Sequence, residues 1–145
     1  MEKLPLRIVV EDGIEAPRYA KSGDAGMDLR STIDVWMRPG QIVNVPTGVR
    51  VAIPDGYVGD VRPRSGLASK HGITVINAPG TIDSGYRGIV GVPLVNLSKK
   101  PYAISRGDRI AQLVIAPIAV CDIEIVDELD ETERGEGGFG SSGLS

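Results

Sequence analysis

The sequence is very poor in histidine and cysteine, with one histidine, His71, and one cysteine, Cys121, in 145 residues. A single histidine excludes a metal site built from several histidines and argues against histidine-centred catalysis. A single cysteine excludes an intrachain disulfide, and the apolar residues around Cys121 predict a strand there. Any chemistry must therefore be carried by carboxylates, Ser, Arg, Lys, Gln or Tyr, and any metal should prefer oxygen ligands.

Long apolar runs and basic blocks are also lacking. Without a stretch of eighteen apolar residues we expect no membrane partner. The N-terminal residues lack the apolar core and cleavage site of a signal peptide, which predicts a cytoplasmic protein. The net charge is −3, but residues 127–145 hold six acidic side chains against one arginine, so the remaining 126 residues carry +2. This distribution predicts no nucleic-acid partner.

Aromatic residues make up only 4% of the chain, whereas 19 glycines and 10 prolines punctuate a sequence rich in Val and Ile. This composition favours short strands and tight turns. We expect one all-β domain over residues 1–126, a sandwich, jelly roll or barrel, with one short helix near 64–72. The expected strands are residues 4–10, 33–37, 42–45, 49–53, 57–62, 73–76, 81–83, 89–96, 102–104, 110–120 and 123–126.

Residues 110–120 are apolar almost throughout, and Gln112 is the one polar exception. A strand with one wet face should alternate between apolar and polar residues. The continuous run therefore predicts that both faces are covered, in part by another subunit.

The stretch NAPGTIDSGYRG, residues 77–88, combines two turn signals with short apolar runs. We expect a hairpin that presents Asp83 and Tyr86 near its tip and borders a pocket. The alternative is that Asp83 only bonds within its own turn.

Residues 127–145 are acidic and then rich in Gly and Ser, which predicts a mobile tail. The tail also contains one arginine, one phenylalanine and several glycines in close order. Such a sequence could bind phosphate oxygens and stack on a base, or it could be a disordered terminus without function.

Five segments share their order and spacing with a known family: AGMDL (25–29), RPRSGLAS (62–69), NAPGTIDSGYRG (77–88), RGDRIAQLV (106–114) and RGEGGFGSSG (134–143). Together they resemble the five motifs of trimeric dUTPases, from about Pro5 to the C-terminus. The resemblance implies a jelly-roll β-barrel and a homotrimer with shared active sites. It also implies hydrolysis of dUTP to dUMP and pyrophosphate, which keeps uracil out of DNA and supplies dUMP for thymidylate synthesis.

The resemblance assigns roles to the residues of the third motif. It implies that Asp83 is the general base that activates water, and that Tyr86 packs on the deoxyribose and excludes a 2′-hydroxyl. Asn77 and the backbone at Thr81 and Ile82 would bind uracil. Gly85 departs from the commoner family pattern, which has an acidic residue before the tyrosine.

The other motifs are implied to bind the triphosphate. Arg64, Ser65 and Gly66 match the phosphate-binding motif, although Ser65 could simply cap the short helix. Gln112 would bond phosphate or the catalytic water, and Asp28 would hold Mg²⁺ through water. In the tail, which would close over the site, the implied ligands are Arg134, Phe139, Gly140, Ser141 and Ser142. Arg106 and Asp108 are expected to be structural.

Two rival functions share this scaffold. The related deoxycytidine triphosphate deaminases place a glutamate on the strand after the third motif, whereas residues 88–97 here hold no carboxylate. A non-catalytic dUTP-binding regulator would have lost Asp83 or the tail motif, and both are present. A structural jelly roll of the capsid type would have no reason to combine Asp83, Tyr86 and the Arg/Gly/Ser tail.

Overall fold

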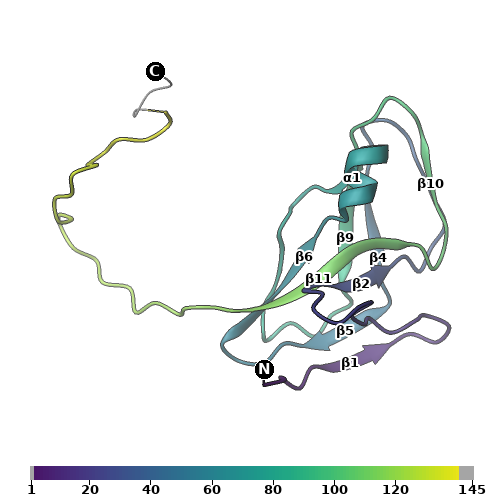
Figure 1. The fold of residues 1–145 in the computed structure, drawn as a ribbon, viewed down its shortest axis with the longest axis horizontal. Helices are drawn as coiled ribbons and strands as arrows, with labels where there is room; N and C mark the ends of the chain where they lie inside the picture. Colours follow the sequence, from purple (N-terminus) through teal and green to yellow (C-terminus); the bar gives the residue numbers. More distant parts are fainter. Residues whose placement is uncertain (1, 141–145) are drawn as a thin grey trace.

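Short β-strands joined by tight turns build almost all of the body of the protein (Figure 1). The computed structural model describes residues 2–140. Its elements are β1 (Arg7–Val10), β2 (Met27–Arg30), β3 (Val35–Met37), β4 (Ile42–Pro46), β5 (Val49–Ala52), β6 (Tyr57–Arg62), α1 (Ser65–His71), β7 (Ile73–Val75), β8 (Gly80–Ile82), β9 (Gly91–Asn96), β10 (Tyr102–Ile104) and β11 (Arg109–Pro117). The expected all-β fold with one short helix is confirmed.

The longest strand, β11, lies inside a four-stranded antiparallel sheet of order β2-β11-β6-β8. Gln112 on β11 stands opposite Asp28 on β2 and Arg62 on β6. Residues directly opposite in an antiparallel pair point to the same face, and neighbours along a strand point to opposite faces. These three polar side chains therefore share the outer face, whereas Leu113 and its partner Val61 are buried on the core face.

The core lies between this sheet and the remaining strands. A three-stranded sheet of order β4-β9-β7 and the pairs β1-β5 and β3-β10 complete the fold. In β5, Val49 and Val51 are buried while Arg50 between them is exposed, which is the period-two pattern of a strand with one buried face. Leu29, Val92 and Leu94 are fully buried. None of the helices among residues 2–140 is long and apolar enough to cross a membrane.

The predicted hairpin around residues 77–88 is wrong. β8 pairs with β6, whereas β9 pairs with β4 and β7, so the two strands that flank Asp83 and Tyr86 belong to different sheets. The turn signals were correct, since the chain does reverse here. The choice of pairing partner was not encoded locally, because it depends on β6 and β4, which lie far away in the sequence.

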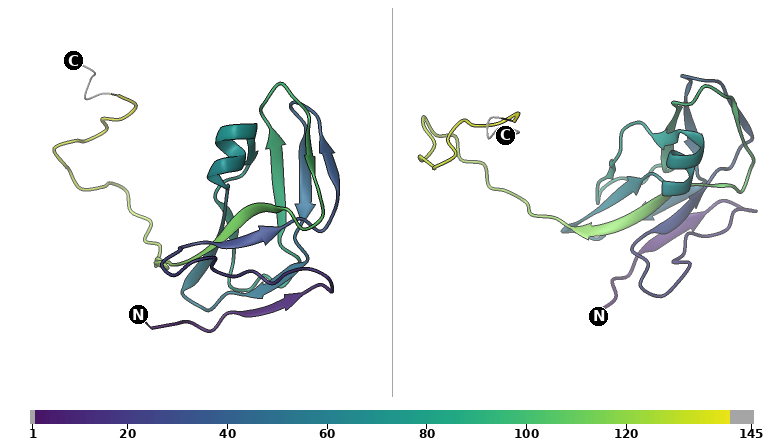
Figure 2. Two further views of the ribbon diagram at one scale, coloured as in Figure 1. Left: turned by 45° about the vertical axis from the view of Figure 1, so that its right-hand side comes forward. Right: turned by 45° about the horizontal axis from the view of Figure 1, so that its top comes forward.

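The C-terminal strand expected at 123–126 is also wrong, and so is the placement of Cys121 in a strand. β11 ends at Pro117, and residues 118–140 form no helix or strand. Cys121, Ile123 and Ile125 are exposed. Both views of Figure 2 show this segment running away from the β-rich body. A strand needs a neighbour to satisfy its backbone groups, and none of the described strands lies beside this segment.

Helix α1 connects β6 to β7 and ends at Gly72, which adopts the left-handed conformation with φ 66°. Glycine takes this conformation without a Cβ penalty, which explains the abrupt end of the helix. The residue before the helix is Arg64, and no side chain caps the first turn. The alternative reading of Ser65 as the helix cap is therefore wrong.

Candidate functional site

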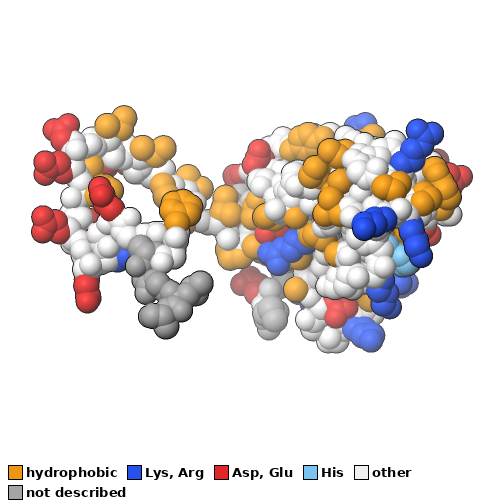
Figure 3. Space-filling model, turned by 90° about the horizontal axis from the view of Figure 1, so that it is seen from above, with side chains coloured by type: hydrophobic (Ala, Val, Ile, Leu, Met, Phe, Trp, Pro, Cys, Tyr) orange, Lys and Arg blue, Asp and Glu red, His pale blue; other side chains and the backbone are white. Residues whose placement is uncertain are grey.

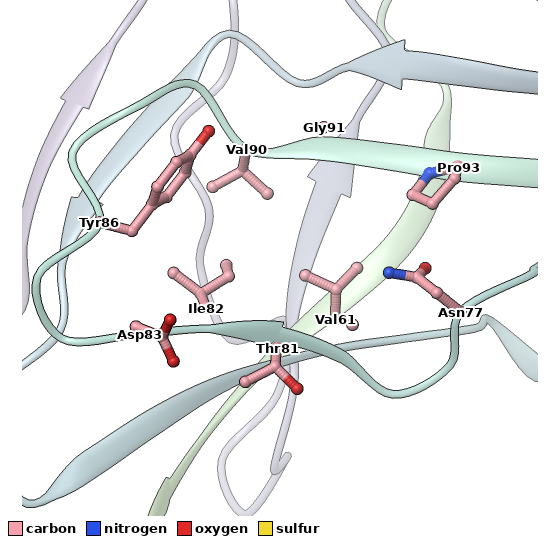
Figure 4. A pocket seen from close by; sticks show the side chains of 10 residues that line it. Val61, Asn77, Thr81, Ile82, Asp83, Tyr86, Val90, Gly91 and Pro93 are labelled. Atoms are coloured by element: carbon pink, nitrogen blue, oxygen red, sulfur yellow. The ribbon is translucent and has the colours of Figure 1, made fainter.

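The space between β8 and β9 forms a cavity of about 220 Å³, called pocket 1 here. It opens where these two strands do not pair, so one edge of β8 borders the cavity. Figure 4 shows Asp83 and Tyr86 at the turn end of this cavity and Asn77 and Pro93 at the other end. The lining residues are Val61, Asn77, Gly80, Thr81, Ile82, Asp83, Tyr86, Val90, Gly91 and Pro93.

Hydrogen bonds within residues 83–89 shape the turn end of pocket 1. The Tyr86 amide donates to the Asp83 carbonyl at 3.1 Å, and the Tyr86 hydroxyl donates to the Ile89 carbonyl at 2.9 Å. The Arg87 guanidinium donates to the Ser84 carbonyl at 2.6 Å and to the Tyr86 carbonyl at 3.0 Å. These four hydrogen bonds therefore fix the conformation of the turn.

The Asp83 carboxylate is exposed, and it forms no hydrogen bond or ion pair with the residues the structure describes. Its side chain lies on the side of β8 opposite Ile82, as alternation along a strand requires (Figure 4). The alternative that Asp83 serves only to bond its own turn is not supported, because its backbone carbonyl accepts the turn hydrogen bond. The carboxylate is free to accept a hydrogen bond from a water or a ligand.

A second cavity of about 400 Å³, called pocket 2, lies where β2 and β11 meet the start of α1. Asp28 stands between two arginines, 3.7 Å from Arg64 Nε and 3.7 Å from Arg109 Nη1. These distances are too long for strong hydrogen bonds, so both guanidiniums can turn toward a bound anion. The lining residues are Ala20, Asp24, Ala25, Gly26, Asp28, Arg64, Ser65, Gly66, Arg109 and Gln112.

Gln112 is fixed in pocket 2 by two neighbours. Its Nε2 donates to the Pro63 carbonyl at 3.0 Å. Gly26 leaves the space that the amide fills: a Cβ at position 26 would overlap Oε1 of Gln112 and would lie 3.1 Å from its Cβ. The second N–H of the amide remains available for a ligand.

The two pockets lie at opposite edges of one sheet, pocket 1 beside β8 and pocket 2 beside β2. Ile82 of pocket 1 points to the core face, but Asp83 next to it points to the outer face. Asp28 and Gln112 of pocket 2 point to that same outer face. β2 and β8 are the two edge strands of this sheet. With the usual spacing between neighbouring strands, they lie about 14 Å apart. No residue lines both cavities. One chain therefore does not unite the two halves of the predicted site.

The tail residues stand apart from both pockets. Figure 3 shows the tail, with its acidic side chains, separated from the body of the molecule. The Arg134 guanidinium donates to the Gly137 carbonyl at 2.6 Å, and Phe139 is fully exposed. Ser141 and Ser142 lie outside the described residues.

The family model for dUTPase matches residues 12–143 of this sequence. The chain belongs to the dUTPase family. The deoxyuridine 5'-triphosphate nucleotidohydrolase of Cutibacterium acnes is 58% identical over 130 residues, covering 89% of this chain and 86% of the relative. The Fusobacterium nucleatum protein of that name is 49% identical over 145 residues, covering 99% of both chains.

Solved dUTPase structures share the fold. The dUTPase of Staphylococcus bacteriophage 80alpha with dUPNHPP has a TM-score of 0.87 and 32% identity, covering 98% of this chain and 100% of that chain. A mutant dUTPase from phage phi11 of S. aureus, described with a structural Mg(II) ion, has a TM-score of 0.82 and 28% identity, covering 88% and 100%. The jelly-roll expectation is confirmed.

Within this dUTPase-family fold, the predicted residues divide into two groups. Pocket 1 collects Asn77, Thr81, Ile82, Asp83 and Tyr86, and pocket 2 collects Asp28, Arg64, Ser65, Gly66 and Gln112.

Arg106 and Asp108 are structural, as expected. Arg106 donates to the Thr32 carbonyl at 2.7 Å, and Asp108 accepts from the Ser105 amide at 2.8 Å.

Sequence reasoning missed Arg109 and Gly26. Arg109 lies in the fourth motif, three residues before Gln112, and that position was the available signal. Its importance became visible only from the structure, in which β11 pairs with β2 and the Arg109 guanidinium lies 3.7 Å from the Asp28 carboxylate.

The donor set of pocket 2 fits Mg²⁺ only as an ion carried by a substrate. No group of three or more His, Cys, Asp or Glu side chains that could hold a metal occurs within residues 2–140. Pocket 2 offers Asp24 and Asp28, balanced by Arg64 and Arg109. Mg²⁺ that is bound mainly by substrate phosphates and water needs only one or two protein carboxylates.

Proposed function

We propose that this protein hydrolyses dUTP to dUMP and pyrophosphate, the activity named for its relatives. The observation that carries the proposal is pocket 1, where an unpaired strand edge leads to a free carboxylate, Asp83, and an aromatic ring, Tyr86. This arrangement would place the base, the sugar and the reacting phosphate of a nucleotide in that order along pocket 1. Removal of dUTP would keep uracil out of DNA, and the product dUMP would supply thymidylate synthesis.

The free edge of β8 suits recognition of uracil. Backbone N–H and C=O groups at Thr81 and Ile82 are fixed by pairing of the other edge with β6. They would bond the edge of uracil together with the Asn77 amide. Cytosine would leave polar groups unpaired, at a cost of about 1–3 kcal/mol each. The Tyr86 ring would lie against the deoxyribose and exclude a 2′-hydroxyl.

Asp83 acts as the general base in this proposal. Its carboxylate takes a proton from a water, whose oxygen forms a bond to the α-phosphorus. The bond from this phosphorus to the bridging oxygen breaks, and pyrophosphate leaves with the bonding electrons. Ser65, with Arg64 and Gly66, would stabilise the leaving group, and Gln112 would bond phosphate or the attacking water.

Mg²⁺ would be held by the triphosphate and, through water, by Asp28. When bound, it supplies positive charge that pocket 2 lacks. The two carboxylates and two guanidiniums of that cavity sum to zero formal charge, whereas a nucleoside triphosphate is strongly anionic. Arg134 of the tail would add a further positive charge.

The division of the predicted residues between two cavities at opposite edges of one sheet supports shared sites in a homotrimer. One dUTP would meet pocket 1 of one chain and pocket 2 of another. The tail, with Arg134, Phe139 and Gly140, would close over this site, because it contacts neither pocket of its own chain. The predicted cytoplasmic location, the domain boundary at 126 and roles for Ser141 and Ser142 stay predictions.

The test is pyrophosphate release with dUTP, dCTP, dTTP and UTP, each with Mg²⁺. We expect turnover of dUTP alone, lowered about 10²–10⁴-fold by Asp83→Asn. Asp55→Asn is the matched control, since Asp55 accepts from the Ser84 hydroxyl at 3.3 Å beside the same turn but lines neither pocket. Deamination of dCTP, or tight dUTP binding without turnover, would support the rival functions instead.

A further inference from the structure

Gly88 lies directly against the Tyr86 ring. A Cβ at position 88 would overlap the Tyr86 hydroxyl oxygen and would lie 2.6 Å from Cζ and 2.9 Å from Cε1 of the ring. Carbon atoms in ordinary contact stand about 3.5–4.0 Å apart, so the ring would have to move by about 1 Å to admit a methyl group. The position of Tyr86 therefore requires glycine at 88.

The Tyr86 ring cannot shift slightly to make room for a methyl group. Its hydroxyl donates to the Ile89 carbonyl at 2.9 Å, and the Arg87 guanidinium holds the Tyr86 carbonyl at 3.0 Å. An aromatic side chain is a rigid plate with two rotatable bonds. If a methyl group at position 88 displaced the ring, the hydrogen bond from Tyr86 to Ile89 would break. The ring would also leave its place in the wall of pocket 1 (Figure 4).

The backbone at Gly88 gives no separate reason for glycine. Its φ lies outside the left-handed region, unlike that of nine other glycines in the described chain, which include Gly72 and Gly107. Alanine at 88 is thus not strained in φ, and its main cost is the contact with Tyr86. Gly85, in the same turn, has no atom within 4 Å of the place its Cβ would take, and its φ is also ordinary.

We propose that Gly88 is a positioning residue that seats the Tyr86 ring and thereby sets the discrimination between deoxyribose and ribose. Steric exclusion of one hydroxyl group needs a wall that is fixed to within about 1 Å, because such a misplacement can cost about 10²-fold. The seat at Gly88 and the hydrogen bond to Ile89 fix this wall together. The inference rests on the proposed role of Tyr86 in dUTP hydrolysis.

The experiment compares Gly88→Ala with Gly85→Ala as its matched control. kcat/KM is measured for dUTP and for UTP with Mg²⁺, and thermal unfolding checks the fold. We expect the dUTP-to-UTP selectivity ratio to fall at least about tenfold in Gly88→Ala and to stay within about twofold of wild type in Gly85→Ala, where the added methyl group meets open space. Equal ratios in the two variants would overturn the proposal.

A second background separates seating from general damage. In Tyr86→Leu the ring is absent, so adding Gly88→Ala should leave the selectivity ratio unchanged. A further fall in that background would overturn the proposal. The double variant also covers the case in which Gly88→Ala alone does not fold. A folded Tyr86→Leu/Gly88→Ala protein would then show that the ring and the methyl group compete for one space. An unfolded double variant would refute the proposal.

Failure of this inference differs from failure of the proposed function. A wild-type protein that does not hydrolyse dUTP would contradict the proposed function. A wild-type protein that is selective for dUTP, with Gly88→Ala behaving like Gly85→Ala, would contradict only the role of Gly88.

Discussion

Mixing two inactive variants should restore activity if each site takes pocket 1 and pocket 2 from different chains. Asp83→Asn damages pocket 1, and Ser65→Ala damages pocket 2. A shared site is intact when its pocket 1 comes from a Ser65→Ala chain and its pocket 2 from an Asp83→Asn chain. In a closed ring with random assembly from equal amounts, this holds for about one quarter of the sites.

The expected recovery is large compared with the background. Loss of a general base leaves about 10⁻² to 10⁻⁴ of the activity. Co-refolding of the two variants should therefore raise turnover to about one quarter of wild type. If the chains form the proposed homotrimer, trimers purified through a different tag on each variant should keep about one intact site in three, whichever variant is in the majority.

The assay is steady-state pyrophosphate release after co-refolding, with mass spectrometry to verify mixed trimers. The control mixes Asp83→Asn with Tyr86→Ala, two lesions in pocket 1, which no shared arrangement can separate. Verified mixed trimers that stay inactive would refute the reasoning from opposite sheet edges. Recovery in the control mixture would refute it equally.

Three further predictions concern single positions. Gly26→Ala should lower kcat because its Cβ would displace Gln112, and steady-state kinetics should show no further loss when Gly26→Ala is added to Gln112→Ala. Leu113→Ala should lower the free energy of unfolding by about 2–5 kcal/mol, because Leu113 is 0% exposed on a central strand of the four-stranded sheet. Denaturant titration measures this loss, and a smaller loss would mean that neighbouring side chains fill the cavity. Phe139→Ala should raise the KM for dUTP about tenfold through lost stacking, without changing the unfolding midpoint, and an unchanged KM would argue against a closing tail.

Local patterns were sufficient for most of the secondary structure of the body, although they missed β2, Met27–Arg30. The alternation at Val49, Arg50 and Val51 and the turn signals at Pro79-Gly80 and Ser84-Gly85 depend on side-chain direction and backbone freedom over a few residues. The helix at 64–72 was found within one residue at each end. The motifs that resemble those of dUTPases are likewise short and contiguous, so they could be found without coordinates.

Pairing partners and contacts between distant segments could not be found in this way. The pattern at residues 77–88 suggested that β8 would pair with β9, but β8 pairs with β6, and the gap that this leaves is pocket 1. The segment at 123–126 has a strand composition but no neighbour to pair with. Which strand pairs with which depends on the energy of the whole core, to which residues far apart in the chain contribute.

The amino-acid sequence was thus enough to identify an all-β chain, its short helix and the residues that we propose bind and hydrolyse a nucleotide. The folded structure was needed to learn that these residues occupy two separate cavities, and that Gly26 and Gly88 make room for Gln112 and Tyr86. The reason is physical: strand and turn tendencies act over a few residues, whereas sheet register and steric contact join residues that the chain itself keeps apart.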